Sequence, residues 1–282
     1  MTNLLTPLAL MLMLMQVGLN PAAGGMPGVP EELRDRPPRE QAGTMSEASP
    51  LTNCLQQTNN DPQRALDTAQ RWRETADSDL GLAQSAHCLG LAMVKLGRMT
   101  EAREAFELAS AEAPADNLAY SARLSAMAGN AAVAEGQIEA ALPLLDRAGG
   151  MALAAEDGPL AAGLRVDLAR ILVRADRQED AAAALAEARE ADESNAEAWL
   201  LSATLSRRLQ RLGEAQSQIE RAAQLDPRNA QVGLEAGVIA AMSGREADAI
   251  ASFSSVLEVA PGSPEARRAQ GYLDQLRKPS PE

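Results

Sequence analysis

The feature that most constrains the fold of this chain is a block that occurs twice in succession. Residues 196–229 read AEAWLLSATLSRRLQRLGEAQSQIERAAQLDPRN, and residues 230–263 read AQVGLEAGVIAAMSGREADAIASFSSVLEVAPGS. Alignment places Ala215 over Ala249 and Pro227 over Pro261, each pair 34 residues apart. A period of this length is typical of stacked helical hairpins, because one hairpin cannot bury its apolar face alone.

The composition favours helices over strands. The chain of 282 residues is 46% hydrophobic, enough for a sizeable core, yet only 2% aromatic, and alanine is abundant. Strands favour aromatic and β-branched residues, whereas Ala, Leu, Glu, Gln and Arg are good helix formers. We therefore expect an all-α protein.

The block resembles the tetratricopeptide repeat (TPR). Trp199 stands at position 4 of the 34-residue unit, Ala215 and Ala222 at the small positions 20 and 27, Ile219 at the bulky position 24 and Pro227 at position 32. The resemblance implies a right-handed superhelical solenoid of helix-turn-helix hairpins. It also implies that the first helices of the hairpins line a concave face, which is the usual ligand groove of the family.

The same register extends along the chain. It predicts a TPR domain at 49–278, with a degenerate unit at 49–82, units at 83–116, 122–155, 162–195, 196–229 and 230–263, and a capping helix at 264–278. Two insertions interrupt it. We expect NLAYS (117–121) to lengthen a first helix and EDGPLA (156–161) to form a loop. Pro143 falls early enough in a second helix to be tolerated there.

The N-terminal 48 residues lie outside this pattern. Residues 1–24 contain an apolar run of the length of a signal-peptide core, although no Lys or Arg precedes it. Residues 25–48 are rich in Pro and Gly, as in a flexible linker. We expect a periplasmic or secreted protein with no membrane span in its mature form; a cytoplasmic protein is the alternative.

The charge distribution points to a class of partner. The net charge of -13 argues against nucleic acid as a partner, since binding phosphates needs clustered Lys and Arg. In the family, however, positions 2, 5, 9, 12 and 13 face the groove, and here they carry several basic residues and one acid, Glu197. The proposed partner-binding residues are Lys95, Arg170, Arg174, Leu200, Thr204, Arg207, Arg208, Leu234, Val238 and Met242.

These residues predict a groove that binds an acidic or carboxylate-bearing peptide. The arginines would pair with carboxylates through their planar forks, and the leucines, valine and methionine would form an apolar floor. The alternative is that the arginines pair with Asp167, Glu197 or other acids of the same chain. The carboxylate clamp of chaperone-binding relatives, Lys at position 5 with Asn at position 9, is absent, because Ala126 accompanies Asn130.

The two cysteines, Cys54 and Cys88, are 34 residues apart, so they would lie on first helices of adjacent units. A disulfide is then geometrically feasible, and export would let it persist. The alternative is two buried thiols. A zinc site with His87 is disfavoured, because no fourth ligand is evident.

No catalytic motif accompanies the repeats. His87 is the single histidine, its neighbour Cys88 cannot reach it across a helix face, and no phosphate-binding loop is present. We expect a non-enzymatic, monomeric scaffold or adaptor without cofactor or metal that binds a protein or peptide. The alternative is a permanent structural or assembly subunit of a cell-envelope or secretion complex.

Overall fold

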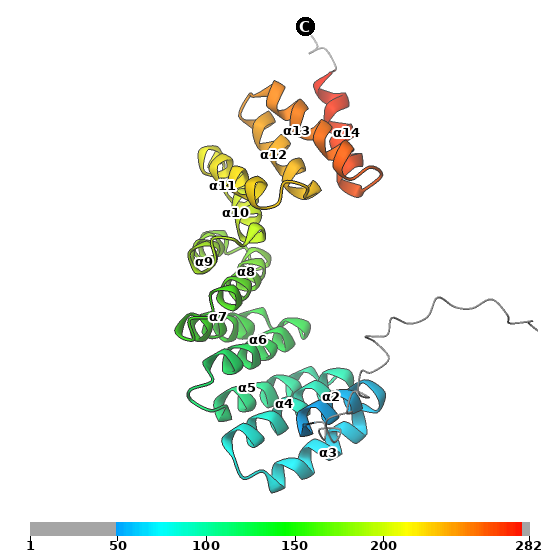
Figure 1. Cartoon of the computed structure of the whole chain (residues 1–282), viewed down its shortest axis with the longest axis vertical. Helices are drawn as coiled ribbons and strands as arrows, with labels where there is room; N and C mark the ends of the chain where they lie inside the picture. The colour runs from blue at the N-terminus through cyan, green and yellow to red at the C-terminus, as the bar shows by residue number, and fades with distance from the viewer. Residues whose placement is uncertain (1–48, 278–282) are drawn as a thin grey trace, which may run out of the picture. The chain divides into compact units, whose positions relative to one another are not determined.

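A computed structural model describes residues 49–277 (Figure 1). In this part of the chain 82% of the residues are helical, in 13 helices, and no strand occurs. The prediction of an all-α superhelical repeat fold is confirmed. The predicted signal peptide (1–24) and linker (25–48) lie outside the described residues. The helices are α2 (Pro50–Asn60), α3 (Pro62–Thr75), α4 (Asp79–Lys95), α5 (Met99–Glu112), α6 (Leu118–Ala134), α7 (Ile138–Ala154), α8 (Gly158–Arg174), α9 (Gln178–Ala191), α10 (Ala196–Arg208), α11 (Leu212–Leu225), α12 (Ala230–Met242), α13 (Glu246–Val259) and α14 (Pro264–Leu276).

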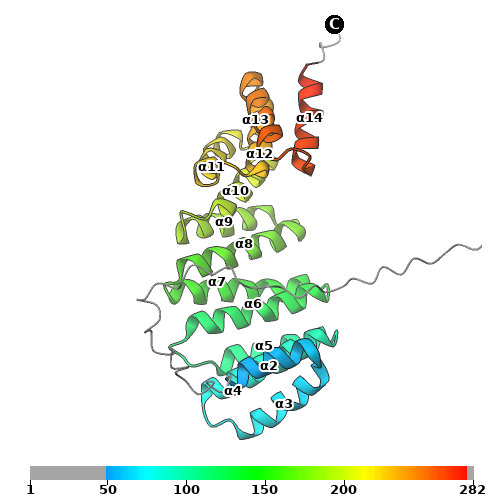
Figure 2. The same cartoon turned by 45° about the vertical axis from the view of Figure 1, so that its right-hand side comes forward.

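The helices from α4 to α13 pair into hairpins that stack in chain order, as Figures 1 and 2 show. Each second helix from α5 to α11 contacts the first helix of the next hairpin as well as its own partner. The hairpin α2–α3 precedes this row, and α14 packs against α13 and α12 at its end. Between residues 49 and 277, no helix has the length and apolar character needed to cross a membrane.

Glycine and a bulky residue fit together inside each of three hairpins. A Cβ atom added at Gly90 would lie 2.5 Å from the ring of Phe106, and one added at Gly129 would lie 2.7 Å from Cγ of Leu145. A Cβ atom added at Gly237 would likewise lie too close to the ring of Phe253. The bulky residue at position 24 therefore packs against the first helix of its own hairpin in these three units.

The turn between the two helices of a hairpin needs a left-handed residue at position 15. Gly97, Gly136 and Gly244 adopt φ angles of +74°, +81° and +72° there. Asp176 and Gln210 occupy the same position with φ angles of 59° and 60°. A non-glycine residue in the left-handed region carries about 1–2 kcal/mol of backbone strain. The turns at Asp176 and Gln210 therefore contain this strain.

Proline ends three of the second helices. Ala113, directly before Pro114, has left the helix with φ -62° and ψ 144°. Helices α11 and α13 likewise stop just before the residue that precedes Pro227 and Pro261. Helix α9 stops at the equivalent place without a proline, because the Asp192 carboxylate accepts hydrogen bonds from the backbone N–H and hydroxyl of Ser194 at 2.9 and 2.6 Å.

The two insertions are both used to lengthen first helices. Helix α6 begins at Leu118, with Asn117 accepting a hydrogen bond from the Tyr120 N–H, so the expectation for NLAYS is confirmed. The expectation of a loop at EDGPLA is wrong for residues 158–161, which are helical. Asp157 caps a helix there by accepting from the Leu160 N–H at 3.1 Å, and α8 begins at Gly158.

Helix α7 continues through Pro143, its sixth residue. A proline at this place cannot donate to the carbonyl four residues earlier, that of Glu139. The helix nevertheless runs to Ala154, because its buried face, including Leu142 and Leu145, packs into the core.

The two cysteines meet at the N-terminal end of the array. Cys54 lies on α2 and Cys88 on α4; both are buried, and their Cα atoms are 6.0 Å apart. That separation lies within the range of native disulfides. Helix α2 packs against α4 as well as against its partner α3 (Figure 2), so a bond at this place would tie the first hairpin to the second.

Candidate partner-binding groove

A pocket of about 300 Å³ opens between the first helices α8 and α10. Side chains of α8 and α10 form its walls, and Leu185 of α9 lies beneath them. We call it the first-helix groove; it is lined by Ala169, Arg170, Val173, Arg174, Leu185, Leu201, Thr204, Leu205 and Arg208. Three arginines and no carboxylate line a groove whose other residues are mostly apolar, in a chain of net charge -13.

The repeat explains why these arginines gather. Arg174 and Arg208 both stand at position 13 of their units, so stacking of successive hairpins places them on the same side of neighbouring first helices. Arg170 lies one turn before Arg174 on α8. Since residues four apart share a helix face, both arginines of α8 line the same groove.

Two of the three arginines have no intramolecular partner among the described residues. Arg170 forms ion pairs with Asp167, at 2.8 Å, and with Glu197. Arg174 and Arg208 are exposed, and neither forms an ion pair or a side-chain hydrogen bond within residues 49–277. The groove therefore offers two unpaired guanidinium groups beside an apolar floor.

A smaller pocket of about 180 Å³ continues the groove toward the C-terminus. It lies between α10, α12 and α14, and it shares Leu201 and Thr204 with the first-helix groove. Its rim carries Glu235, Glu265 and Arg268. The two pockets thus adjoin at Leu201 and Thr204; arginines line the first, and the second has residues of both charges.

The arginine predicted beside this second pocket is already paired. Arg207 donates to the Glu235 carboxylate, with Nε and Oε1 2.5 Å apart, and both side chains are largely covered. The sequence left open whether the groove arginines pair within the chain; for Arg207 and Arg170 they do, whereas Arg174 and Arg208 have no such partner among the described residues.

The other predicted groove residues differ in how exposed they are and in whether they line a pocket. Leu200 and Leu234 are buried, Val238 is half-buried, and Met242 is 40% exposed, with Sδ 4.0 Å from Nη1 of Arg207. Lys95 is exposed at the end of α4 and lines neither pocket. Sequence reasoning missed Leu201 and Leu205, which lie between the expected groove positions, and Arg268, which belongs to the capping helix.

His87, which the family pattern assigns to the groove, lies in the core. It is 8% exposed, and its Nδ1 lies 3.1 Å from the hydroxyl of Tyr120. The rings of Phe106 and Tyr120 pack against it. Burial lowers the pKa of His87 to about 4, so the imidazole is neutral near pH 7. Within residues 49–277, no three His, Cys, Asp or Glu side chains gather as they would around a metal ion.

Comparison with known proteins supports this architecture. A family model described as tetratricopeptide repeat matches residues 166–215 and 200–264. No curated protein sequence matches the chain.

Solved structures of low sequence identity resemble most of the described array. PilF of Pseudomonas aeruginosa is 17% identical with a TM-score of 0.56, over 79% of this chain and 96% of PilF. YrrB, described as a TPR protein with an unusual peptide-binding site, is 20% identical with a TM-score of 0.53, over 73% of this chain and 99% of YrrB. MamA is 17% identical with a TM-score of 0.51, over 64% of this chain and 97% of MamA.

The family match covers the best-formed units, and the structural matches extend the same fold toward the N-terminus. Proteins of this fold are in general protein-interaction scaffolds. Residues 166–264 are thus similar in sequence to tetratricopeptide repeats, and the described part of the chain has the fold of a TPR solenoid.

Proposed function

We propose that the protein is a non-enzymatic scaffold that binds an acidic segment of a partner protein in the first-helix groove. The observation that carries the proposal is the pair of unpaired guanidinium groups, Arg174 and Arg208, above an apolar pocket. Carboxylates of the partner would pair with these two arginines. An aliphatic side chain of the partner would pack on Val173, Leu201 and Leu205.

Charge and packing together favour this ligand class. Arginine forks bind carboxylates through two parallel hydrogen bonds, and such charge-assisted bonds contribute about 1.5–3 kcal/mol each. The guanidinium groups of the groove disfavour basic peptides and give neutral ones no ion pair, whereas the acidic surface elsewhere does not attract an anion. Specificity would therefore reside in the groove itself.

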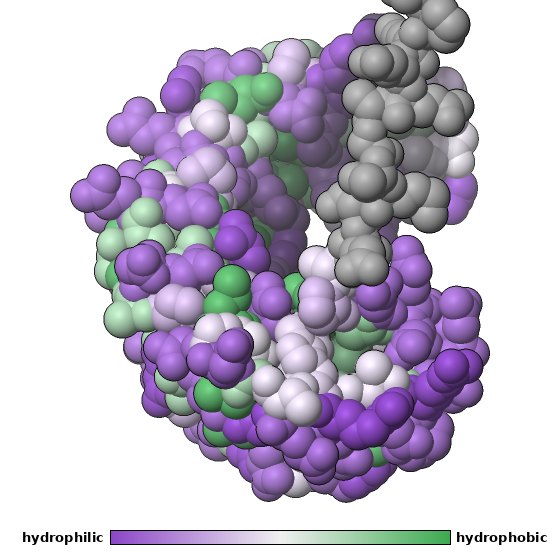
Figure 3. Space-filling view, turned by 60° about the horizontal axis from the view of Figure 1, so that its bottom comes forward, coloured by the Kyte–Doolittle hydropathy of each residue, from purple (hydrophilic) through white to green (hydrophobic). Residues whose placement is uncertain are grey.

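The exposed hydrophobic residues support a self-standing scaffold over an obligate subunit of a larger complex. The large exposed hydrophobic side chains are spread along the described residues: Leu55, Leu80, Leu108, Leu153, Met242 and Tyr272 lie on six different helices, and Leu96 follows the end of α4. On the face shown in Figure 3, hydrophobic residues form small patches between hydrophilic ones. A permanent interface is normally a broader apolar surface.

The test uses a fluorescein-labelled peptide, SELELS, and its uncharged counterpart, SQLQLS, with fluorescence anisotropy as the readout. The glutamate peptide should bind and the glutamine peptide should bind at least about tenfold more weakly, since about 1.4 kcal/mol corresponds to tenfold in affinity. Raising the ionic strength should weaken the first and leave the second nearly unchanged.

The variant Arg174→Gln/Arg208→Gln should lose this preference. The matched control is Arg147→Gln/Arg228→Gln, which removes the same charge from exposed positions outside the groove. Equal affinity for the two peptides in the native protein, or an equal loss in both variants, would contradict the proposal.

A further inference from the structure

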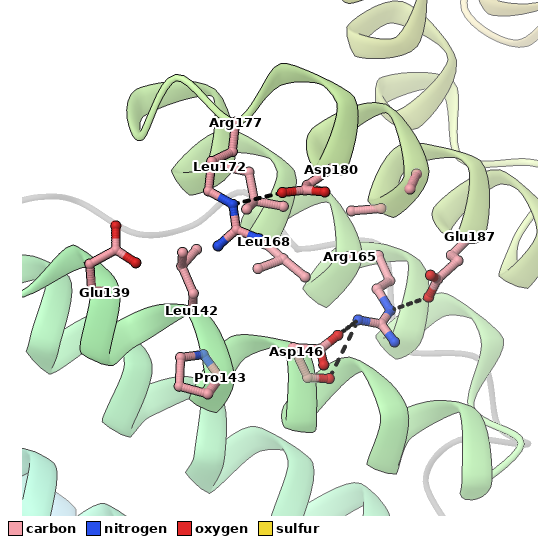
Figure 4. Close-up of a pocket in the computed structure, with 12 residues that line it drawn as sticks. Glu139, Leu142, Pro143, Asp146, Arg165, Leu168, Leu172, Arg177, Asp180 and Glu187 are labelled. Carbon is pink, nitrogen blue, oxygen red and sulfur yellow. Dashed lines mark hydrogen bonds and ion pairs between the residues drawn. The ribbon is translucent and has the colours of Figure 1, made fainter.

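A second cleft, on the opposite side of the hairpins, has a different chemistry. It lies between the second helices α7 and α9, with α8 forming its floor, and encloses about 400 Å³ (Figure 4). We call it the α7–α9 cleft; it is lined by Glu139, Leu142, Pro143, Asp146, Arg165, Leu168, Leu172, Arg177, Asp180, Ala183, Ala184 and Glu187. It shares no lining residue with the first-helix groove.

The floor of the cleft is apolar. Leu142, Leu168 and Leu172 are each less than a tenth exposed and belong to the central core of the array. On the α9 side, Ala183 and Ala184 leave the cleft wide. An aliphatic chain placed here would contact the three leucines and keep its polar end at the rim.

One end of the cleft is closed by a buried arginine. Arg165 is 7% exposed, with Nη1 2.5 Å from Oδ1 of Asp146 on α7 and Nε 2.8 Å from Oε2 of Glu187 on α9. Figure 4 shows the guanidinium between these two carboxylates. Because carboxylates flank it on both sides, Arg165 has little capacity left for an external anion.

The other end also has two carboxylates and one arginine, but only one of its carboxylates forms an ion pair among the described residues. Arg177, the residue directly before α9, pairs with Asp180 of α9 at 2.6 Å. Glu139 faces them from α7, and no cation of residues 49–277 pairs with it (Figure 4). The lining thus carries four carboxylates against two arginines, and both arginines are already engaged.

We propose that the α7–α9 cleft receives a lysine or arginine side chain from a basic segment of a partner protein. The stem of the side chain would lie on Leu142, Leu168 and Leu172, and its cationic head would pair with Glu139 and Asp180. Long basic side chains commonly pack their methylenes on apolar surface while the charge reaches polar groups. The net charge of -13 also attracts a basic partner at long range.

With this cleft, the scaffold would have two binding surfaces that prefer ligands of opposite charge. The first-helix groove takes carboxylates, and the α7–α9 cleft takes a cation. This inference does not rest on the proposed function, because it uses other residues on the opposite side of the hairpins.

The test is a methyl NMR titration with three capped tripeptides that differ in one side chain: Ala-Lys-Ala, Ala-Met-Ala and Ala-Glu-Ala. The lysine peptide should shift the methyl signals of Leu142, Leu168 and Leu172 in a saturable manner, with a dissociation constant in the millimolar range expected for so small a ligand, about 1–10 mM. The methionine and glutamate peptides should not. A saturable shift with the glutamate peptide, or no shift with the lysine peptide, overturns the proposal.

Matched variants locate the effect. Glu139→Gln/Asp180→Asn should weaken lysine binding at least about fivefold, whereas Glu104→Gln/Asp116→Asn, which removes the same charge at exposed positions elsewhere, should not. Ala183→Leu should fill the cleft from its exposed edge and abolish the shifts without entering the core. Thermal melts check that each variant folds. If either Glu139→Gln/Asp180→Asn or Ala183→Leu binds the lysine peptide with unchanged affinity, the proposal is overturned.

Two further experiments complete the test. The first asks whether the cation comes from a protein segment or from a polyamine, and the second asks whether the cleft binds independently of the first-helix groove. Spermidine, a polyamine, should bind more weakly than the lysine peptide at equal ionic strength; tighter binding of spermidine overturns a protein segment as the ligand. Arg174→Gln/Arg208→Gln should leave the lysine titration unchanged, so failure of the groove proposal and failure of this one are distinguishable.

Discussion

The ring of Phe106 occupies the space that a side chain at Gly90 would need: a Cβ there would lie 2.5 Å from the ring. The two residues belong to the facing helices α4 and α5, and the same fit recurs in two other hairpins. Glycine at this position is therefore required by packing, since the helical backbone itself would favour alanine.

Gly90→Ala should lower the free energy of unfolding by about 1–3 kcal/mol, because the phenyl ring must move within a closely packed core. The matched control is Gly150→Ala in α7, where nothing lies within 4 Å of the added atom. That change should be neutral or stabilising by up to about 1 kcal/mol. Urea denaturation measures both, and equal effects of the two substitutions would show that the ring is not the cause.

Gly97→Ala should cost about 1 kcal/mol through backbone strain alone, because φ is +74° and no atom lies within 4 Å of the new Cβ. Gln210→Gly, at the equivalent turn with φ 60°, should do the opposite and raise the melting temperature slightly. The gain is reduced by the greater freedom of glycine in the unfolded chain. A lower melting temperature for Gln210→Gly would contradict this account.

Stability should fall on the acid side because of His87. Burial lowers its pKa to about 4 in the folded protein, against about 6.5 in the unfolded chain. The neutral form is favoured by folding, so the contribution is complete above pH 6.5 and is lost as the pH falls toward 4. Between pH 7.5 and pH 5 the loss should be about 2 kcal/mol.

His87→Gln keeps a polar side chain beside Tyr120 but cannot titrate in this range. The free energy of unfolding of this variant should decline less between pH 7.5 and pH 5 than that of the native protein. The difference between the two declines should equal the contribution of His87. Urea denaturation at pH 7.5 and pH 5 compares the two proteins, and parallel declines would mean that other groups account for the acid sensitivity.

We propose that Cys54 and Cys88 form a disulfide in the functional protein, in keeping with export to an oxidising compartment. Bonding residues separated by 34 positions should stabilise the folded state by about 3–4 kcal/mol on the chain-entropy account. Reductant should therefore lower the melting temperature of the native protein and leave that of Cys54→Ala/Cys88→Ala unchanged. Maleimide labelling of two thiols in the denatured, unreduced protein would rule the bond out.

The sequence alone predicted the packing pattern well, because the repeat positions are local and periodic. Phe106, Leu145 and Phe253 stand opposite small residues at a fixed spacing, and Pro114, Pro227 and Pro261 end helices through their own backbone geometry. Even so, residues 158–161 of the loop expected at 156–161 are helical, since capping by Asp157 and packing of the lengthened α8 outweigh the turn preference of Gly158 and Pro159.

The candidate site depended on tertiary structure. The repeat register placed Arg170, Arg174, Arg207 and Arg208 on one face, but only the fold decided which carboxylates come near them. Glu235, from the next hairpin, reaches Arg207, while Arg174 and Arg208 have no carboxylate partner among the described residues. Likewise, the α7–α9 cleft joins residues of three helices that share no sequence motif. Helix formation and hairpin packing follow from neighbours along the chain, whereas the charge left on a surface depends on residues that stacking brings together.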